Sequence, residues 1–219
     1  MPAHRHLNLD GTFGGWVADT AKVVFTATVG SKALVYDSAE VLDNAVVRDS
    51  AQVYGKARIL HSAVVKESAR VCGLGKAGGR AQICGHAVVS EHAMVEGNAQ
   101  VSDDAIIRGN GYVSENAFVG KHAVIEGTAF VKGWATIVGA AKVMDKATIG
   151  HEARIEGDAE IGGETLIGGK VRIAGRSLVR DVDLANGQYV DENVGASAQE
   201  HLERRKNLRE LLSLDNEIG

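Results

Sequence analysis

The chain has 219 residues, of which 45% are hydrophobic and 24% are charged, a balance typical of soluble, ordered proteins. Its formal net charge is -4 at pH 7, and no dense run of Lys and Arg occurs, which argues against nucleic acid as a partner. No window of 18 residues is continuously apolar, and the first residues lack the apolar core of a secretory signal. We therefore expect a cytoplasmic protein with no membrane partner.

Residues 1–14 precede a long repeat and contain one large aromatic side chain, Phe13. We interpret this segment as an N-terminal cap that shields the first coil of the repeat. Phe13 is its expected apolar anchor.

From Gly15 to Val182 the sequence divides into 28 consecutive six-residue units without a slip of phase. Position 1 is Ala in 22 of these hexads, and position 3 is Val or Ile in all but one, where it is Ala77. Side chains alternate with period two along a strand, so positions 1 and 3 face one side, which we assign to the interior. Position 5 is mainly Gly or Asp, residues that tolerate the backbone angles of a tight corner.

Each hexad is therefore predicted to be a short strand followed by a corner. Such a short strand buries its apolar face only by stacking on copies of itself, and hexapeptide β-helices place three hexads in each coil. The 28 hexads make about nine coils, roughly 45 Å long at ~4.8 Å per stacked strand. We predict an all-β fold, with one parallel β-helix over residues 15–182.

The pattern dissolves after Val179, and residues 183–196 are predicted to form a linker loop with a turn at Asn186 and Gly187. A C-terminal α-helix is predicted over residues 197–219, because Ser197 and Glu200 have the spacing of a capping box and leucines recur among charges. We expect this helix to cover the last coil. A helical contact between subunits is the alternative.

The stretch ATIGHEARIEGDAEIGGETLIGGK repeats an aliphatic residue followed by a small or acidic one. It resembles the left-handed β-helix superfamily of hexapeptide-repeat proteins, which includes many bacterial acyltransferases and the γ-class carbonic anhydrases. The hexads cover about three quarters of the chain, and earlier ones depart from the family pattern at Tyr36, Leu42, Tyr54 and Leu60. The resemblance implies left-handed winding and a homotrimer packed along the prism axis.

Residues 18 apart are expected to lie on the same wall, one coil apart. One column at the outward positions 2 and 4 is rich in apolar side chains and is interrupted by Gln52 and Arg70. Its apolar members are Trp16, Leu34, Tyr36, Tyr54, Cys72, Val88, Ile106, Val124 and Met144. A stripe of this length predicts an interface, so we expect self-association through this wall.

Three residues are candidates for catalysis. His86 and His122 occupy the same hexad position two coils apart, with Asp104 between them. Stacking at ~4.8 Å would let the Asp104 carboxylate orient either imidazole. The alternative interpretation is that these polar residues decorate a solvated corner.

The resemblance to γ-carbonic anhydrases can be tested on their zinc ligands. Those enzymes use three His, including one in an Ile-Gly-His sequence and another five residues later. Here Ile149, Gly150 and His151 are present, but Glu156 stands five residues after His151 and Glu115 stands 36 residues before it. One ligand of three does not make a zinc site, so we expect no bound metal.

Two functions remain open. The first is an oligomeric scaffold or binding protein without catalytic machinery or cofactor. The second is an acyltransferase with acyl-CoA as co-substrate and a histidine base between subunits, as the resemblance implies. Hexapeptide acyltransferases use a loop that leaves the coil and a groove for pantetheine, and 28 unbroken hexads leave no place for such a loop. No phosphate loop, catalytic-triad spacing or nucleotide motif indicates cofactor-binding residues.

Overall fold

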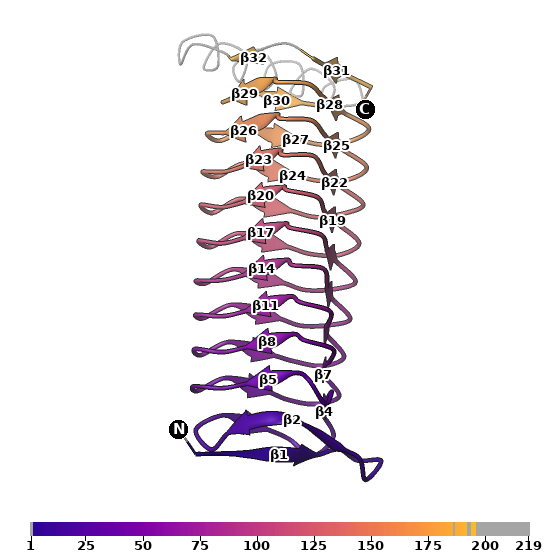
Figure 1. Ribbon diagram of the computed structural model, residues 1–219. Coiled ribbons are helices and arrows are strands. Elements are labelled where there is room, and N and C mark those ends of the chain that lie inside the picture. Colours follow the sequence, from indigo (N-terminus) through magenta and orange to yellow (C-terminus); the bar gives the residue numbers. More distant parts are fainter. Residues whose placement is uncertain (1, 186, 192–193, 196–219) are drawn as a thin grey trace, which may run out of the picture.

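The computed structural model describes residues 2–185, 187–191 and 194–195, which form a three-walled parallel β-solenoid (Figure 1). The described residues contain no helix, so the all-β prediction is confirmed for them. The three walls are sheets of 12, 10 and 10 strands, which corresponds to about ten turns where the hexads alone predict about nine. The predicted helix over 197–219 lies outside the described residues.

Each wall takes every third strand of the chain. Wall A contains, in spatial order, β1 (Ala3–Leu7), β2 (Phe13–Ala18), β5 (Leu34–Val35), β8 (Gln52–Val53), β11 (Arg70–Val71), β14 (Val88–Val89), β17 (Ile106–Ile107), β20 (Val124–Ile125), β23 (Lys142–Val143), β26 (Glu160–Gly162), β29 (Leu178–Arg180) and β32 (Val194–Gly195). Wall B contains β3 (Lys22–Val23), β6 (Glu40–Val41), β9 (Arg58–Ile59), β12 (Lys76–Ala77), β15 (Met94–Val95), β18 (Tyr112–Val113), β21 (Phe130–Val131), β24 (Thr148–Ile149), β27 (Leu166–Ile167) and β30 (Asp183–Leu184). Wall C contains β4 (Thr28–Val29), β7 (Val46–Val47), β10 (Val64–Val65), β13 (Gln82–Ile83), β16 (Gln100–Val101), β19 (Phe118–Val119), β22 (Thr136–Ile137), β25 (Arg154–Ile155), β28 (Arg172–Ile173) and β31 (Tyr189–Val190).

The register follows the 18-residue period of three hexads. On wall A, Val88 pairs with Ile106, and Ile106 pairs with Val124. The same spacing relates successive strands of this wall from β2 to β29. The outward columns predicted from the sequence are therefore real rows of side chains.

The core is a single column of small and branched side chains. Hexad positions 1 and 3 are fully buried from Ala27 onward, and the largest buried side chains are isoleucines. Two polar residues interrupt the column of Ala at position 1, and both are satisfied: Thr165 Oγ1 donates to the Gly162 carbonyl at 2.7 Å, and Ser177 Oγ donates to the Ala174 carbonyl at 2.6 Å. The narrow interior explains why so few aromatic residues are used.

The corners adopt a left-handed backbone conformation. Every position 5 from Asp37 to Asp181 has positive φ, and 12 of these residues are not glycine. Nearly all of the 12 carry a side-chain acceptor, which in most cases accepts the N–H of the corner residue one coil further on. Asp37 Oδ2 accepts from Gly55 N at 3.0 Å, and Glu67 Oε2 accepts from Gly85 N at 2.8 Å. The same bond is made by Asp43, Asp49, His61, Glu91, Asp103, Glu115 and Asp145.

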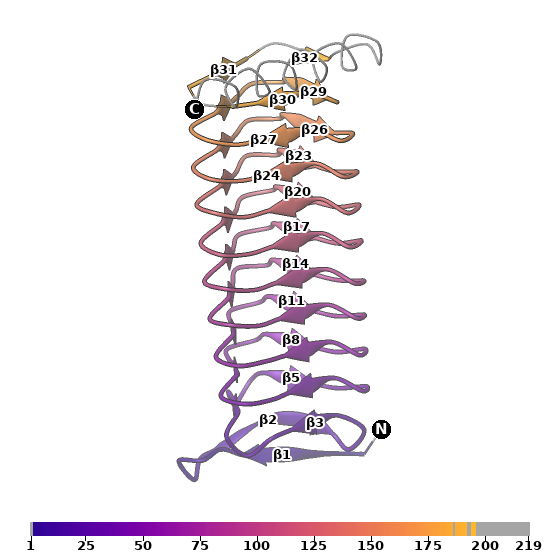
Figure 2. The same cartoon turned by 180° about the vertical axis from the view of Figure 1, so that it is seen from behind.

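The N-terminal segment closes the first coil with polar groups. β1 runs antiparallel to β2 across the base of the solenoid (Figure 2). Asn8 is buried; its Oδ1 accepts the N–H of Val29 at 2.9 Å, and its Nδ2 donates to the carbonyl of Val29 at 3.2 Å. His6 is also buried, with Nε2 3.2 Å from the Ala27 carbonyl.

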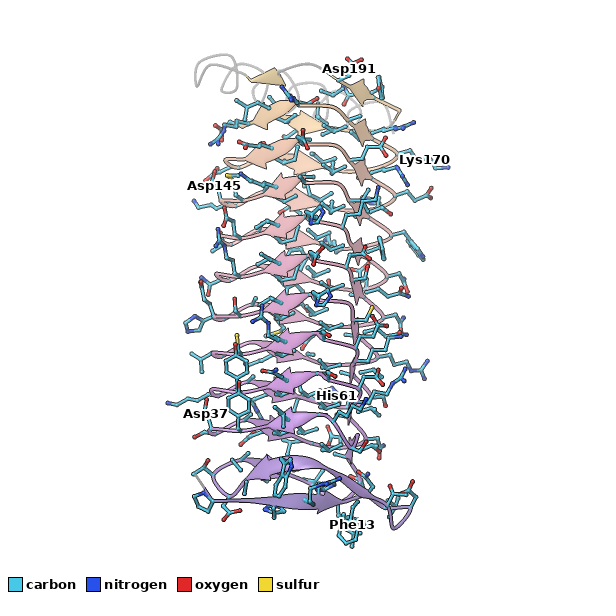
Figure 3. All side chains as sticks on the ribbon, in the orientation of Figure 1. Phe13, Asp37, His61, Asp145, Lys170 and Asp191 are labelled. Atoms are coloured by element: carbon cyan, nitrogen blue, oxygen red, sulfur yellow. The ribbon has the colours of Figure 1, made fainter. Side chains whose placement is uncertain are left out.

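The prediction of Phe13 as an apolar anchor is wrong. Its side chain is 69% exposed and points away from the base (Figure 3). The end of a β-solenoid presents unpaired peptide groups as well as apolar side chains, and unpaired buried peptide groups are costly. Asn8 therefore supplies the two hydrogen bonds that a strand beneath β4 would otherwise make.

The solenoid also continues past its predicted end. The stretch predicted as a linker loop contains β30, β31 and β32, which extend the three walls. Val182, Leu184 and Val190 prolong the core, but the register shortens to 17 residues where Leu166 pairs with Asp183. Because these last strands do not follow the hexad phase, a count of regular hexads does not predict them.

Candidate functional site

The three candidate residues lie on the corner that connects wall C to wall A. His122 Nδ1 is 3.4 Å from Asp104 Oδ2, so the structure brings these two side chains together. His86 lies one coil below Asp104 and is exposed; no side-chain hydrogen bond or ion pair of His86 occurs among the described residues. Of the three predicted residues, His122 and Asp104 are therefore in contact, and His86 is separate from them.

The environment of this contact is open to water. The side chains of His122 and Asp104 are 72% and 52% exposed, so solvent screens the attraction between them. The neighbouring carboxylate of Asp103 is already occupied, because it accepts from Lys121 N at 2.8 Å and from Ser102 Oγ at 3.2 Å. The pair can orient an imidazole, but the described groups beside it provide no further acid or base in contact with it.

The residues compared with zinc ligands are engaged elsewhere. Glu115 accepts the N–H of Gly133 at 3.1 Å. Hydrogen bonds from Arg172 and Arg154 lower the pKa of Glu156. Within residues 2–185, 187–191 and 194–195, no cluster of three His, Cys, Asp or Glu side chains is arranged to hold a metal ion.

Wall A carries the apolar stripe in the expected rows. The rings of Tyr36 and Tyr54 stack with centroids 4.9 Å apart and planes within 1°, and the Tyr36 hydroxyl donates to Gln52 Oε1 at 3.3 Å. Burial raises the pKa of Tyr36, and a hydrogen bond with Cys72 followed by burial raises that of Tyr54. Stacking of coil on coil leaves eight of the nine apolar members of the stripe only partly exposed, whereas the ninth, Trp16, is 51% exposed.

Wall B carries a second apolar row, which the sequence analysis missed. Met94 pairs with Tyr112 and Tyr112 with Phe130, and the two rings stack with centroids 4.6 Å apart. The Tyr112 hydroxyl donates to Glu96 Oε2 at 2.8 Å, and burial followed by this bond raises its pKa. The spacing of 18 residues at position 2 was the signal that could have revealed this row.

Polar side chains dominate the edges of the prism. Asp37 and Asp145 lie along the edge between walls A and B, and Lys170 projects from the edge between walls B and C (Figure 3). Many charged residues pair with a residue on a neighbouring coil, as Arg108 does with Glu126 at 2.5 Å. These ion pairs run from coil to coil in contact with water, and they do not bring an acid and a base together in an enclosed site.

Comparison with known proteins agrees with the solenoid. The family description "YdcK Beta solenoid repeat" matches residues 51–67, a stretch that holds β8, β9 and β10 and therefore one strand of each wall. No curated protein matches the chain. Among the described residues no helix has the length and apolarity needed to cross a membrane. The matched repeat and the three parallel walls identify the chain as a β-solenoid repeat protein.

Proposed function

We propose that the protein is an oligomeric scaffold or binding protein that associates through wall A and has no catalytic machinery. The observation that carries this proposal is the unbroken 18-residue register of wall A from β2 to β29. A coil that never opens offers no loop to fold over a substrate, and enclosure is what gives catalytic groups their strength. The proposal includes left-handed winding of the coils, which follows from the resemblance.

The choice of wall A rests on two apolar rows that follow each other along it. Tyr36, Tyr54 and Cys72 form the first, and Val88, Ile106 and Val124 form the second. On wall B the row of Met94, Tyr112 and Phe130 stops at the coil before Met94, where Lys76 and Gly78 hold the outward positions. An apolar row at the centre of a wall is what the core of an interface needs. Wall C differs, because the network of Arg154, Glu156 and Arg172 would have to lose water on association. Three copies is the number that the resemblance implies.

Light scattering tests the self-association. We expect a molar mass near three times the 23.0 kDa of one chain. Ile106→Lys places a charge in the apolar row without touching the interior, so it should reduce the mass to that of one chain and leave the β circular dichroism unchanged. Gln100→Lys is the matched control at the same hexad position of wall C and should not change the mass. A wild-type mass of one chain would overturn the proposal.

The alternative, an acyl-CoA-dependent acyltransferase, is favoured by one observation, the contact between His122 and Asp104 at 3.4 Å. Thermal unfolding with and without millimolar acetyl-CoA separates the two functions. The scaffold proposal expects no shift of the midpoint for wild type or for His122→Ala. A shift in wild type that disappears in His122→Ala would favour the transferase.

A further inference from the structure

A hollow of about 190 Å³ lies on wall B near the C-terminal end of the solenoid. It is formed where β24, β27 and β30 stack, and the residues that line it include Leu166 and Leu184. The volume corresponds to about six water-sized groups, well below the size of pockets for drug-sized ligands. It can therefore take a small molecule but not the body of a coenzyme.

Two glycines open this hollow. Position 4 of wall B is Leu42 and Leu60 in early coils, whereas Gly150 and Gly168 hold that place here. A Cβ on Gly168 would lie 3.3 Å from His151 Nδ1, and a Cβ on Gly150 would lie 3.6 Å from Lys132 Cε. Larger side chains at these two places would thus fill the space. The φ angle of neither glycine is positive, so their role here is to leave room.

Each polar side chain of the lining can donate a hydrogen bond. Lys132, Thr148 and His151 contribute an ammonium, a hydroxyl and an imidazole, and no Asp or Glu is among the described residues that line the hollow. The peptide N–H groups of Gly150 and Gly168 already donate to Ile167 and Leu184 carbonyls. The side chains are therefore the groups available to a ligand.

Within the described part of the chain, the ammonium of Lys132 has no carboxylate partner, unlike those of the three lysines that follow it in the chain. Three lysines of this half pair with a glutamate one coil away: Lys142 with Glu160, Lys146 with Glu164, and Lys170 with Glu152. One coil above Lys132 stands Gly150, and Lys132 forms no ion pair among the described residues. Its Nζ lies 5.7 Å from the centroid of the Phe130 ring, a cation–π contact that keeps the charge beside the hollow.

We propose that this hollow binds a small carboxylate with a short aliphatic tail. The carboxylate accepts hydrogen bonds from the Lys132 ammonium, the Thr148 hydroxyl and the His151 ring, and the tail packs on Leu166 and Leu184. The positive charge of Lys132 selects an anion, and the two leucines of the lining select against a purely inorganic one. The inference does not depend on self-association through wall A, which is on a different face.

Titration calorimetry with sodium butyrate tests the inference on the whole chain. We expect saturable binding in the millimolar range, at least tenfold weaker in Gly168→Leu, which fills the hollow, and in Lys132→Met, which removes the charge. Gly78→Leu, at the same hexad position of the same wall but outside the hollow, is the matched control and should bind as wild type does. Circular dichroism of each variant checks that it is folded.

Two results would overturn the inference. One is the absence of butyrate binding in a folded wild type. The other is that inorganic phosphate or butylamine binds as strongly as butyrate. Equal binding of phosphate would show that the aliphatic tail contributes nothing, and equal binding of butylamine would show that the negative charge contributes nothing. The molar mass from light scattering on the same samples does not depend on butyrate binding. A failure of the butyrate experiment therefore does not affect the proposal of self-association.

Discussion

At the scale of single residues, the corners explain a feature of composition that turn propensity alone does not. Gly and Asp are expected at position 5 because they tolerate positive φ, and the structure places them there. Glu67, Glu91 and Glu115 are not typical turn residues, yet they occupy the same conformation because each accepts the N–H of the next corner. The acceptor offsets the strain of the left-handed backbone.

Lys121 is the exception that tests this idea. It has φ of 57° and a side chain with no acceptor, and the corner residue one coil further on is Gly139. Lys121→Asn should raise the free energy of unfolding by about 0.5–1.5 kcal/mol, since Asn tolerates this conformation and its Oδ1 can accept the Gly139 N–H. Urea unfolding measures the change. Lys56→Asn, at an exposed position 6, is the control, and equal effects in both variants would contradict the explanation.

Asn8 carries the second residue-scale prediction. Its amide makes both hydrogen bonds to Val29, so Asn8→Ala leaves a buried N–H and carbonyl unpaired and should cost about 1–3 kcal/mol. Hydrogen exchange at the Val29 amide should accelerate strongly. Asn8→Asp keeps the acceptor and should retain part of the protection. Unchanged exchange in Asn8→Ala, relative to the exposed control Asn44→Ala, would show that another group caps β4.

At the scale of elements, the hexad period predicts nearly every strand and the wall on which it lies. Positions 1 and 3 keep one side inward for 28 hexads, so a strand of two residues such as β17 could be assigned without tertiary information. The ends could not be predicted in this way. β1 reverses direction, and β30 to β32 follow a shortened register, so neither end repeats the pattern from which the rest is inferred.

The ion pairs between neighbouring strands predict that the stability of the fold depends on pH. Hydrogen bonds from Arg172 and Arg154 on β28 and β25 lower the pKa of Glu156 below its ordinary value of 4.5. A carboxyl with a lowered folded-state pKa contributes stability that is present above the unfolded pKa and is lost as pH falls through the folded pKa.

Glu156→Gln should therefore reduce stability at pH 7 by at most about 1 kcal/mol, because the two arginine partners are 52% and 57% exposed and solvent screens the attraction. The difference between wild type and variant should shrink as the pH falls below 4.5, the ordinary value of this carboxyl. Urea unfolding at pH 7 and at pH 3 measures both. A difference that grows in acid would contradict the assigned direction.

At the scale of the whole molecule, the fold is predictable and the candidate site is not. The sequence places His122 and Asp104 on one corner, which the structure confirms, but His86 on the same corner makes no side-chain hydrogen bond or ion pair with Asp104 among the described residues. The hollow beside Lys132 was missed because a glycine at an outward position shows no chemistry of its own. The hollow exists because Gly150 and Gly168 lie on neighbouring coils, so that the space left by two absent side chains is continuous.

The modular register predicts which deletions the solenoid tolerates. Removing residues 87–104 deletes one complete coil and joins two hexads in phase, so the protein should remain β-rich, shorter by ~4.8 Å and less stable. Removing Ala93 alone shifts every later interior side chain outward and should prevent folding. Circular dichroism and urea unfolding compare the two. Equal stability of both deletions would contradict the role of the hexad phase.

Small-angle X-ray scattering distinguishes association side by side through wall A from association through the base of the solenoid. The base of the solenoid offers a competing surface, since Leu7, Leu9 and Phe13 there are 57%, 67% and 69% exposed. Side-by-side packing predicts that wild type has the same long dimension as the Ile106→Lys monomer and a larger cross-sectional radius of gyration. An unchanged cross-section with a lengthened particle would contradict association through wall A and assign the association to the base.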